Sequence, residues 1–195
     1  MKHDENESRR RRLLRAALAL PFVPIHAARA QTLPLTPSCG EKPAPTPAQT
    51  PGPFYTPNSP KRDSLVEPGA GGERLVVAGF VLSPRCAPVA NALLDFWHCD
   101  AQGDYDNRGF RYRGHLLTDA QGRYRLETIV PGEYPGRTRH IHVKVQAPGG
   151  RVLTTQLYFP DEPRNRSDWI YRPELTMQVT RASTRRDARF DFVVT

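Results

Sequence analysis

The stretch that decides the fold runs from Gly122 to Ala147 and reads GRYRLETIVPGEYPGRTRHIHVKVQA. It contains two runs rich in β-forming residues, at 122–130 and 139–147, separated by a segment with two Pro-Gly pairs. Short runs of this kind, bounded by turn residues, are typical of β-strands. The stretch therefore predicts two strands joined by a Pro/Gly-rich loop.

Runs of the same kind occur on both sides of this stretch. We expect strands at 74–82, 91–98, 122–130, 139–147, 152–159, 174–179 and 188–194. Turn residues separate them without a long helical segment, although a helical turn is expected around Ser167 to Tyr171. This spacing is typical of an antiparallel sandwich or barrel. We therefore expect an all-β fold, an antiparallel β-sandwich over residues 73–195.

Two further segments precede the sandwich. Residues 31–72 are rich in Pro, Thr, Gly and Ser, and the prolines exclude a regular helix, so we expect an extended Pro-rich N-terminal arm. Residues 1–30 contain a run of arginines, a short apolar stretch and then Ala28-Arg29-Ala30. This is the pattern of an export signal of the twin-arginine type, and the alternative is a disordered basic tail on a cytosolic protein. Because the apolar stretch is too short to span a bilayer, we expect an exported, periplasmic or extracellular protein without a stable membrane anchor.

The net charge of +8 invites a nucleic-acid interpretation, but half of it lies in the first 30 residues. The rest is spread over the body, without a lysine-rich block or an aromatic RNA-binding signature. We therefore expect no nucleic-acid partner. The basic body either steers anionic small molecules or is simply a solvated face.

Three cysteines, Cys39, Cys86 and Cys99, fit one disulfide and one remaining thiol in an oxidising compartment. Cys86 and Cys99 flank the expected strand at 91–98 and are the pair that we favour, with three buried thiols as the alternative. The spacing of the cysteines does not fit a structural zinc site.

The strand at 139–147 carries a candidate metal chelate. Alternate side chains of a strand point to opposite faces, so Ile141, Val143 and Val145 share the core face while His140 and His142 point together to the other. Two adjacent imidazoles can bind a metal ion, although an H-x-H pair on an exposed strand also arises by chance.

Two tyrosines near turns could join this pair. Tyr134 lies between the two Pro-Gly turns, six residues before His140, and Tyr105 follows the strand at 91–98 after a Gly turn. Each could equally be an ordinary loop aromatic that packs its ring. Tyr124, in contrast, lies within the alternating run at 122–130 and is expected to be structural.

These residues belong to a longer ordered set of motifs. TPAQTPGPFYTP, DFWHCDAQGDY, RGHLLTDAQGRYRLETIVPGEYPGR, HIHVKV, TTQLYF and ARFDFVV follow one another over residues 45–195. In this order they resemble the intradiol ring-cleavage dioxygenases, most of all the protocatechuate 3,4-dioxygenase-like, small secreted branch.

The resemblance implies an Fe(III) cofactor with two phenolate and two imidazole ligands: Tyr105, Tyr134, His140 and His142. It also implies that Arg137 is catalytic and that Gln156 and Tyr55 bind the substrate. The implied reaction cleaves a catechol-type ring between its two hydroxyls with both atoms of O2, giving a muconate-type diacid. The residue types agree, because hard anionic phenolates suit ferric iron better than zinc or the ferrous iron of two-histidine, one-carboxylate sites.

Some features depart from the family pattern. The link from Tyr134 to His140 lacks the tryptophan-containing insertion of the large protocatechuate enzymes, and Gly136 stands where a bulky residue is frequent. Both departures imply a more open pocket. Arg139 adds a second cation next to His140, which could help to bind an acidic substrate or face solvent. Which diol is cleaved stays open, and a homo-oligomer is compatible with the sequence.

Two other interpretations remain. One is a non-catalytic transthyretin-like β-sandwich that acts as a binding module, because this fold does not by itself imply catalysis. The other keeps the four ligands but binds zinc or copper. The four-ligand set together with Arg137 favours the enzyme, because a binding module has no need of it.

Overall fold

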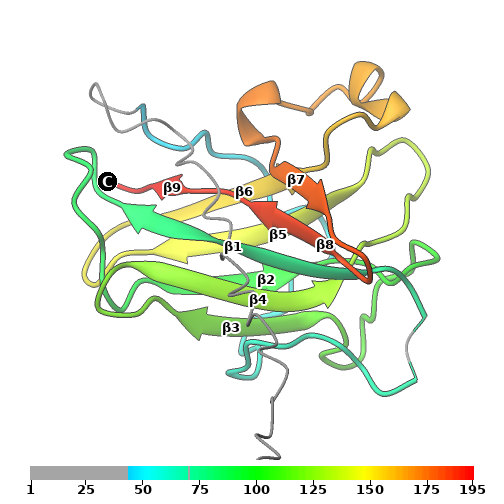
Figure 1. Ribbon diagram of the computed structural model, residues 1–195, viewed down its shortest axis with the longest axis horizontal. Helices are drawn as coiled ribbons and strands as arrows, with labels where there is room; N and C mark the ends of the chain where they lie inside the picture. Colours follow the sequence, from blue (N-terminus) through cyan, green and yellow to red (C-terminus); the bar gives the residue numbers. More distant parts are fainter. Residues whose placement is uncertain (1–43, 70) are drawn as a thin grey trace, which may run out of the picture. The chain divides into compact units, whose positions relative to one another are not determined.

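The computed structural model describes residues 44–69 and 71–195, which form an all-β domain of two packed sheets (Figure 1). The elements are β1 (Arg74–Leu82), β2 (Leu93–Trp97), β3 (Arg113–Leu117), β4 (Arg123–Ile129), β5 (His140–Gln146), β6 (Val152–Tyr158), η1 (Pro163–Arg166), η2 (Pro173–Leu175), β7 (Gln178–Arg181), β8 (Arg186–Arg189) and β9 (Phe192–Val193). One sheet has the order β4-β1-β8-β7, with β9 also paired to β1, and the other has the order β3-β2-β5-β6. The expected β-sandwich is confirmed.

The core lies between the two sheets. Val77 of β1, Phe96 of β2 and Val143 of β5 are each fully buried in one apolar cluster. In β5 the residues expected on the core face are buried there, and the alternate residues point to the outer face of the sheet. The period of two in the sequence therefore sets which side chains are free to build a site.

One of the two sheets is mixed, whereas the other is antiparallel as expected. The β3-β2-β5-β6 sheet is antiparallel throughout, but β1 pairs with both β8 and β9 in parallel. The expected strand at 188–194 is split in two, because the amide of Phe80 donates to the carboxylate of Asp191 (2.9 Å) at the point where β8 ends and β9 has not begun.

Three other expectations need local correction. The sequence RGHLL forms β3, which was not expected as a strand. The beginning of the expected strand at 174–179 is the 3-10 turn η2, which starts at Pro173, and β7 begins at Gln178. The expected helical turn around 167–171 lies slightly earlier, as η1, where a proline again occupies the first position.

The part of the Pro-rich arm that the structure describes has no helix or strand beyond isolated bridges and lies against the sandwich. Its backbone bonds to both sheets: the amide of Gln49 donates to Thr154 (2.7 Å), that of Arg62 to His115 (2.9 Å) and that of Leu65 to Glu127 (2.8 Å). The expected export signal, at 1–30, lies outside the described residues. Within 44–69 and 71–195, no helix has the length and apolar character needed to cross a bilayer.

The favoured cysteine pair was wrong. Cys99 is a free, buried thiol, so it cannot be bonded to Cys86. Cys86 is itself disulfide-bonded, and Cys39 lies outside the described residues.

Candidate metal centre

Strand β5 holds the two histidines on its outer face. His140 and His142 are 2% and 1% exposed. Trp97 of the neighbouring β2 lies opposite His142 in register and stacks on its ring, with centroids 4.8 Å apart and planes at 5°. The two histidines are therefore buried and held in a fixed orientation, unlike an H-x-H pair that arises by chance on a solvent-exposed strand face.

The coordinating atoms of the histidines point at one another. The two Nε2 atoms are 3.2 Å apart, and the oxygen of Tyr134 lies 3.3 Å from Nε2 of His140. Nδ1 of His140 donates to the carbonyl of Thr138 (2.6 Å), which leaves the lone pair on Nε2. Two ligands about 2.1 Å from one ion and at right angles would be about 3.0 Å apart. The three atoms thus have the separation of neighbouring ligands.

Tyr105 completes the set from a different loop. Its ring lies 5.8 Å from that of Tyr134 and 6.3 Å from that of His142. Phe54 of the arm stacks on the Tyr105 ring at 4.3 Å. The Tyr105 hydroxyl is buried and interacts with the Tyr134 side chain, but its geometry makes no regular hydrogen bond to any of the described residues. Buried hydroxyls normally have a partner, so this oxygen has the environment of a ligand atom.

The two tyrosine loops touch through glycines. A Cβ at Gly103, where φ is +96°, would lie 2.3 Å from the carbonyl oxygen of Glu133, and one at Gly132 would lie 2.4 Å from the amide nitrogen of Gly103. The amide of Gly132 also donates to the carbonyl of Asp100 (2.7 Å). Each glycine lies two residues before one of the candidate ligand tyrosines, so this backbone contact brings the two phenols together.

The polypeptide alone keeps the four groups neutral. Burial lowers the pKa of His140 to about 4 and holds that of His142 well below its usual value, while burial raises the pKa of Tyr105 and of Tyr134. Neutral imidazoles are ready ligands, whereas the phenols need a nearby cation to ionise. A bound metal ion supplies that charge, and two hard phenolates with two imidazoles fit a ferric ion.

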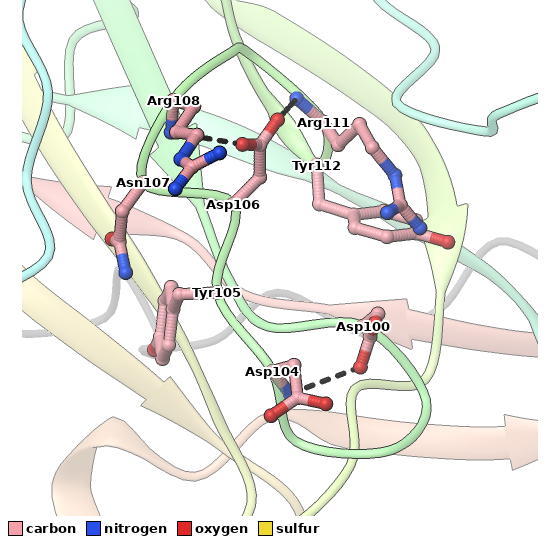
Figure 2. A pocket seen from close by; sticks show the side chains of 8 residues that line it. All are labelled: Asp100, Asp104, Tyr105, Asp106, Asn107, Arg108, Arg111 and Tyr112. Carbon is pink, nitrogen blue, oxygen red and sulfur yellow. Dashed lines mark hydrogen bonds between the residues drawn. The ribbon is translucent and has the colours of Figure 1, made fainter.

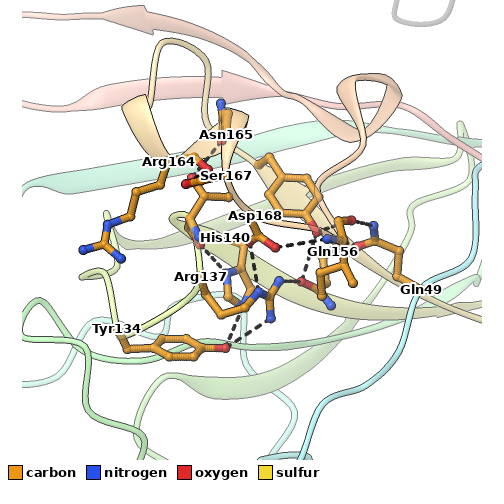
Figure 3. Close-up of polar contacts among 12 residues, drawn as sticks. Gln49, Tyr134, Arg137, His140, Gln156, Arg164, Asn165, Ser167 and Asp168 are labelled. Carbon is orange, nitrogen blue, oxygen red and sulfur yellow. Dashed lines mark hydrogen bonds and ion pairs between the residues drawn. The ribbon is translucent and has the colours of Figure 1, made fainter.

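An arginine extends the site beyond the ligands (Figure 3). Nη1 of Arg137 donates to the oxygen of Tyr134 (3.3 Å) and Nη2 to Oε1 of Gln156 (2.6 Å). Nε of Arg137 donates to Oδ2 of Asp168 (2.9 Å), which also accepts the amide of Thr138 (2.9 Å). The side chain of Asp168 is only 1% exposed. One buried carboxylate therefore orients both the arginine and the backbone that leads to His140.

The arm closes this network from the other side. Nε2 of Gln156 donates to the carbonyl of Thr50 (3.0 Å), and the hydroxyl of Tyr158 donates to Oε1 of Gln49 (2.8 Å). The side chain of Gln49 in turn donates to the carbonyl of Ile170 (2.5 Å). Arm, β6 and the segment after η1 thus meet around the residues that hold Arg137.

Comparison with known proteins agrees with this geometry. A family model described as Dioxygenase matches residues 50–195. The chain belongs to the intradiol dioxygenase family.

Three relatives show the range of this family. The dioxygenase domain of a dioxygenase carbohydrate-binding protein fusion from the cellulolytic bacterium Streptomyces sp. SirexAA-E is 54% identical, with a TM-score of 0.76 over 77% of this chain and 98% of that chain. Catechol 1,2-dioxygenase 2 of Acinetobacter lwoffii is 30% identical over 76% of this chain and 64% of its own length. The protocatechuate 3,4-dioxygenase beta chain of Burkholderia cepacia is 38% identical over 52% and 51%. The chain thus spans half to two thirds of the curated relatives' length.

Two further residues singled out from the sequence make contacts away from the four candidate ligands. The hydroxyl of Tyr55 donates to Asp95 (3.2 Å) and its ring packs on Trp97, so it reaches the histidines only through that indole. Its substrate-binding role stays a prediction. Arg139 pairs with Glu162 (3.0 Å) and also donates to the carbonyl of Pro131, so its charge is engaged by protein groups.

Some residues of the site were not found from the sequence. Phe54 and Trp97 lie within two of the quoted motifs but had no role assigned to them, and Asp168 lies in none of the motifs. Each acts through a contact with a residue distant in the chain. Only the position of Trp97, next to a candidate strand end, could have pointed to it.

A cavity of about 360 Å³ lies beside the loop that carries Tyr105 (Figure 2). It is lined by Asp100, Asp104, Tyr105, Asp106, Asn107, Arg108, Arg111 and Tyr112. The carboxylate of Asp106 accepts the backbone amides of Arg108, Gly109 and Arg111. These hydrogen bonds fix the loop directly after Tyr105.

Proposed function

We propose that the protein is an Fe(III)-dependent dioxygenase that cleaves a catechol-type ring between its two hydroxyls, using O2 and giving a muconate-type diacid. The observation that carries the proposal is that Nε2 of His140 lies 3.2 Å from Nε2 of His142 and 3.3 Å from the oxygen of Tyr134. Beside them lies a second phenol, whose oxygen has no hydrogen-bond partner in the described part of the chain. Curated relatives named catechol 1,2-dioxygenase and hydroxyquinol 1,2-dioxygenase support the reaction class.

Tyr105, Tyr134, His140 and His142 would hold the metal. The chemistry that ferric iron supplies when bound is withdrawal of electron density from a coordinated diol, which activates the ring toward O2.

The chain's own groups bind and orient the diol around that centre. A catechol must lose its hydroxyl protons to bind as a dianion, and the oxygen of Tyr134 is a proton acceptor at the edge of the ligand set. Arg137, which is always protonated, donates to this oxygen and is held by Gln156 and Asp168. Its charge is therefore preorganised next to the atoms where negative charge develops.

Trp97, Phe54 and the arm exclude water from the ligands. The indole covers one face of His142, and Phe54 covers the Tyr105 ring. Exclusion of water strengthens the interactions of the buried charges with the reacting diol.

We propose export for this protein as well, because residues 1–30 have the pattern of a twin-arginine signal. This proposal is tested by immunoblots of periplasmic and cytoplasmic fractions for the wild-type chain and for a variant in which Arg11 and Arg12, the pair directly before Leu13, are changed to lysines. Retention of both forms in the cytoplasm would refute it.

The decisive test of the activity is a visible absorption spectrum of the iron-loaded protein, before and after catechol or protocatechuate is added under nitrogen. We expect a phenolate-to-iron band that moves to longer wavelength with a diol, and O2 consumption with ring opening when air is admitted. A colourless protein that holds zinc, or no metal after iron loading, would contradict the proposal and favour the transthyretin-like binding module.

A further inference from the structure

Arg113 of β3 is a buried cation whose hydrogen bonds go to backbone carbonyls. The residue is 1% exposed. Its Nε and Nη2 donate to the carbonyl of Asp106 (3.0 and 2.8 Å), and its Nη1 donates to the carbonyl of Phe54 (2.6 Å). A buried charge is costly unless other groups compensate for it, so these contacts call for an explanation.

Both carbonyls belong to segments that enclose the ligand Tyr105. Asp106 is the next residue after Tyr105, and the ring of Phe54 stacks on the Tyr105 ring at 4.3 Å. The guanidinium carbon of Arg113 itself lies 5.9 Å from the centre of that ring. One side chain therefore ties together the backbone behind the phenol and the aromatic ring on its face.

The acidic side chains nearest to Arg113 have other partners. The carboxylate of Asp106 accepts the backbone amides of its own loop. That of Asp95 accepts the hydroxyls of Tyr55 and Ser59. The phenol of Tyr105 also faces this cation. In contrast to the two carboxylates, its oxygen has no hydrogen-bond partner among the residues described.

We propose that Arg113 is the positioning residue of the Tyr105 ligand. Its three hydrogen bonds fix the ring between the Asp106 backbone and Phe54, and its charge stabilises the electrons of the phenolate when the metal is bound. The inference rests on the proposed function, because it requires Tyr105 to be a ligand. It concerns a residue that does not touch the metal, and it assigns to the arm a role in holding the ligand.

The test uses Arg113→Gln and Arg113→Lys in the full-length, iron-loaded protein. Loss of the charge raises the energy of the phenolate electrons relative to iron, so the visible band of the Gln variant should move to longer wavelength. Loss of groups that orient a ligand typically weakens metal binding by about 10- to 100-fold, and we expect that range for iron release to a chelator. The Lys variant keeps the charge but loses the forked geometry. Its band should stay near the wild-type position while it also releases iron faster.

Arg62→Gln is the matched control. Arg62 also donates to two carbonyls, those of Arg113 and Phe110, and pairs with Glu67. Because its contacts do not include Tyr105 or Phe54, a merely structural loss should change the unfolding midpoint and leave the band and the iron-release rate unchanged.

The outcomes separate the two proposals. A wild-type protein without the band overturns the proposed function and this inference with it. A wild-type band that is unchanged in Arg113→Gln, with wild-type iron release, overturns the inference alone. If circular dichroism shows that Arg113→Gln is unfolded, the Lys variant decides: iron release at the wild-type rate overturns the inference, and faster release with an unshifted band supports it.

Discussion

Removal of the Tyr105 hydroxyl should stabilise the iron-free protein while it abolishes normal iron binding. The hydroxyl is buried and has no partner among the residues described, and a buried, unsatisfied polar group costs about 1–3 kcal/mol. Tyr105→Phe removes that cost and leaves only a small void. We expect the unfolding free energy of the iron-free variant to exceed that of wild type by up to about 2 kcal/mol, since part of the gain is lost to the void.

Tyr124→Phe is the matched control, because its hydroxyl is also buried but donates to the carbonyl of Phe190 (2.8 Å). Its removal leaves that carbonyl unsatisfied and should cost about 1–2 kcal/mol. The two variants should therefore differ by roughly 1–4 kcal/mol, or roughly 3–15 °C in melting temperature for a domain of this size. Urea and thermal unfolding of the iron-free proteins, followed by circular dichroism, measure the difference.

Iron binding completes the experiment. Only Tyr105→Phe should lose the visible band or show it displaced and weakened, while Tyr124→Phe should keep the wild-type spectrum. If Tyr105→Phe destabilises the iron-free protein as much as Tyr124→Phe does, its hydroxyl has a partner within the fold and is not reserved for a metal. An unaltered spectrum in Tyr105→Phe would exclude it as a ligand.

Three further predictions concern the stability of the iron-free protein. Asp168→Asn leaves Arg137 as an uncompensated, largely buried charge, so the variant should lose about 3–5 kcal/mol of unfolding free energy. Its kcat should also be lower. A loss below about 1 kcal/mol in urea unfolding would refute the orienting role of Asp168. Gly103→Ala forces a Cβ to within 2.3 Å of a backbone oxygen and should cost at least about 2 kcal/mol. Gly149 also has a positive φ, of +70°, but nothing lies within 4 Å of its Cβ position, so Gly149→Ala should cost about 1–2 kcal/mol. Equal costs for the two variants, measured by urea unfolding, would contradict the loop contact. Burial lowers the pKa of His98 to about 4, below its unfolded value, so the unfolded chain takes up a proton that the folded protein does not. The free energy of unfolding of the iron-free protein should therefore be greatest above about pH 6.5 and should decrease toward pH 4, by on the order of 3 kcal/mol for His98. His140 and His142 act in the same direction. An unfolding free energy that does not change with pH, measured by urea unfolding, would refute this prediction.

The sequence was a good guide wherever the signal is local. The period of two in HIHVKV placed His140 and His142 on one face, and the structure confirms this and buries the alternate residues in the core. The two tyrosines have no such periodic signal, and their expected role came from the ordered resemblance. What joins them to the histidines is the contact of the Gly103 loop with the Gly132 loop.

The misses share a non-local cause. Strand β3 contains Gly114, where a Cβ would meet Arg62 and Leu65 of the arm at 2.8 Å, so its environment is set by a segment about 50 residues away in the chain. The parallel pairing of β8 with β1 depends on which strand edge is still open, and no residue pattern encodes that choice. Asp168 has an effect on the site only because the segment after η1 returns to Arg137.

The energetics of the site explain why these features occur together. The four candidate ligands are buried and neutral, and the hydroxyl of Tyr105 has no hydrogen-bond partner in the described part of the chain, so they lower the stability of the iron-free fold. A module that only presents a surface would gain from replacing them with apolar side chains of the same size. Retaining them is favourable only if a cation ionises the phenols and uses the imidazole lone pairs. Two side chains hold these groups in place before the metal binds: Asp168 orients Arg137, and Arg113 orients Tyr105. Candidate ligands that destabilise the iron-free fold, together with neighbouring residues that hold them rigidly in place, are the combination expected of a preorganised metal centre.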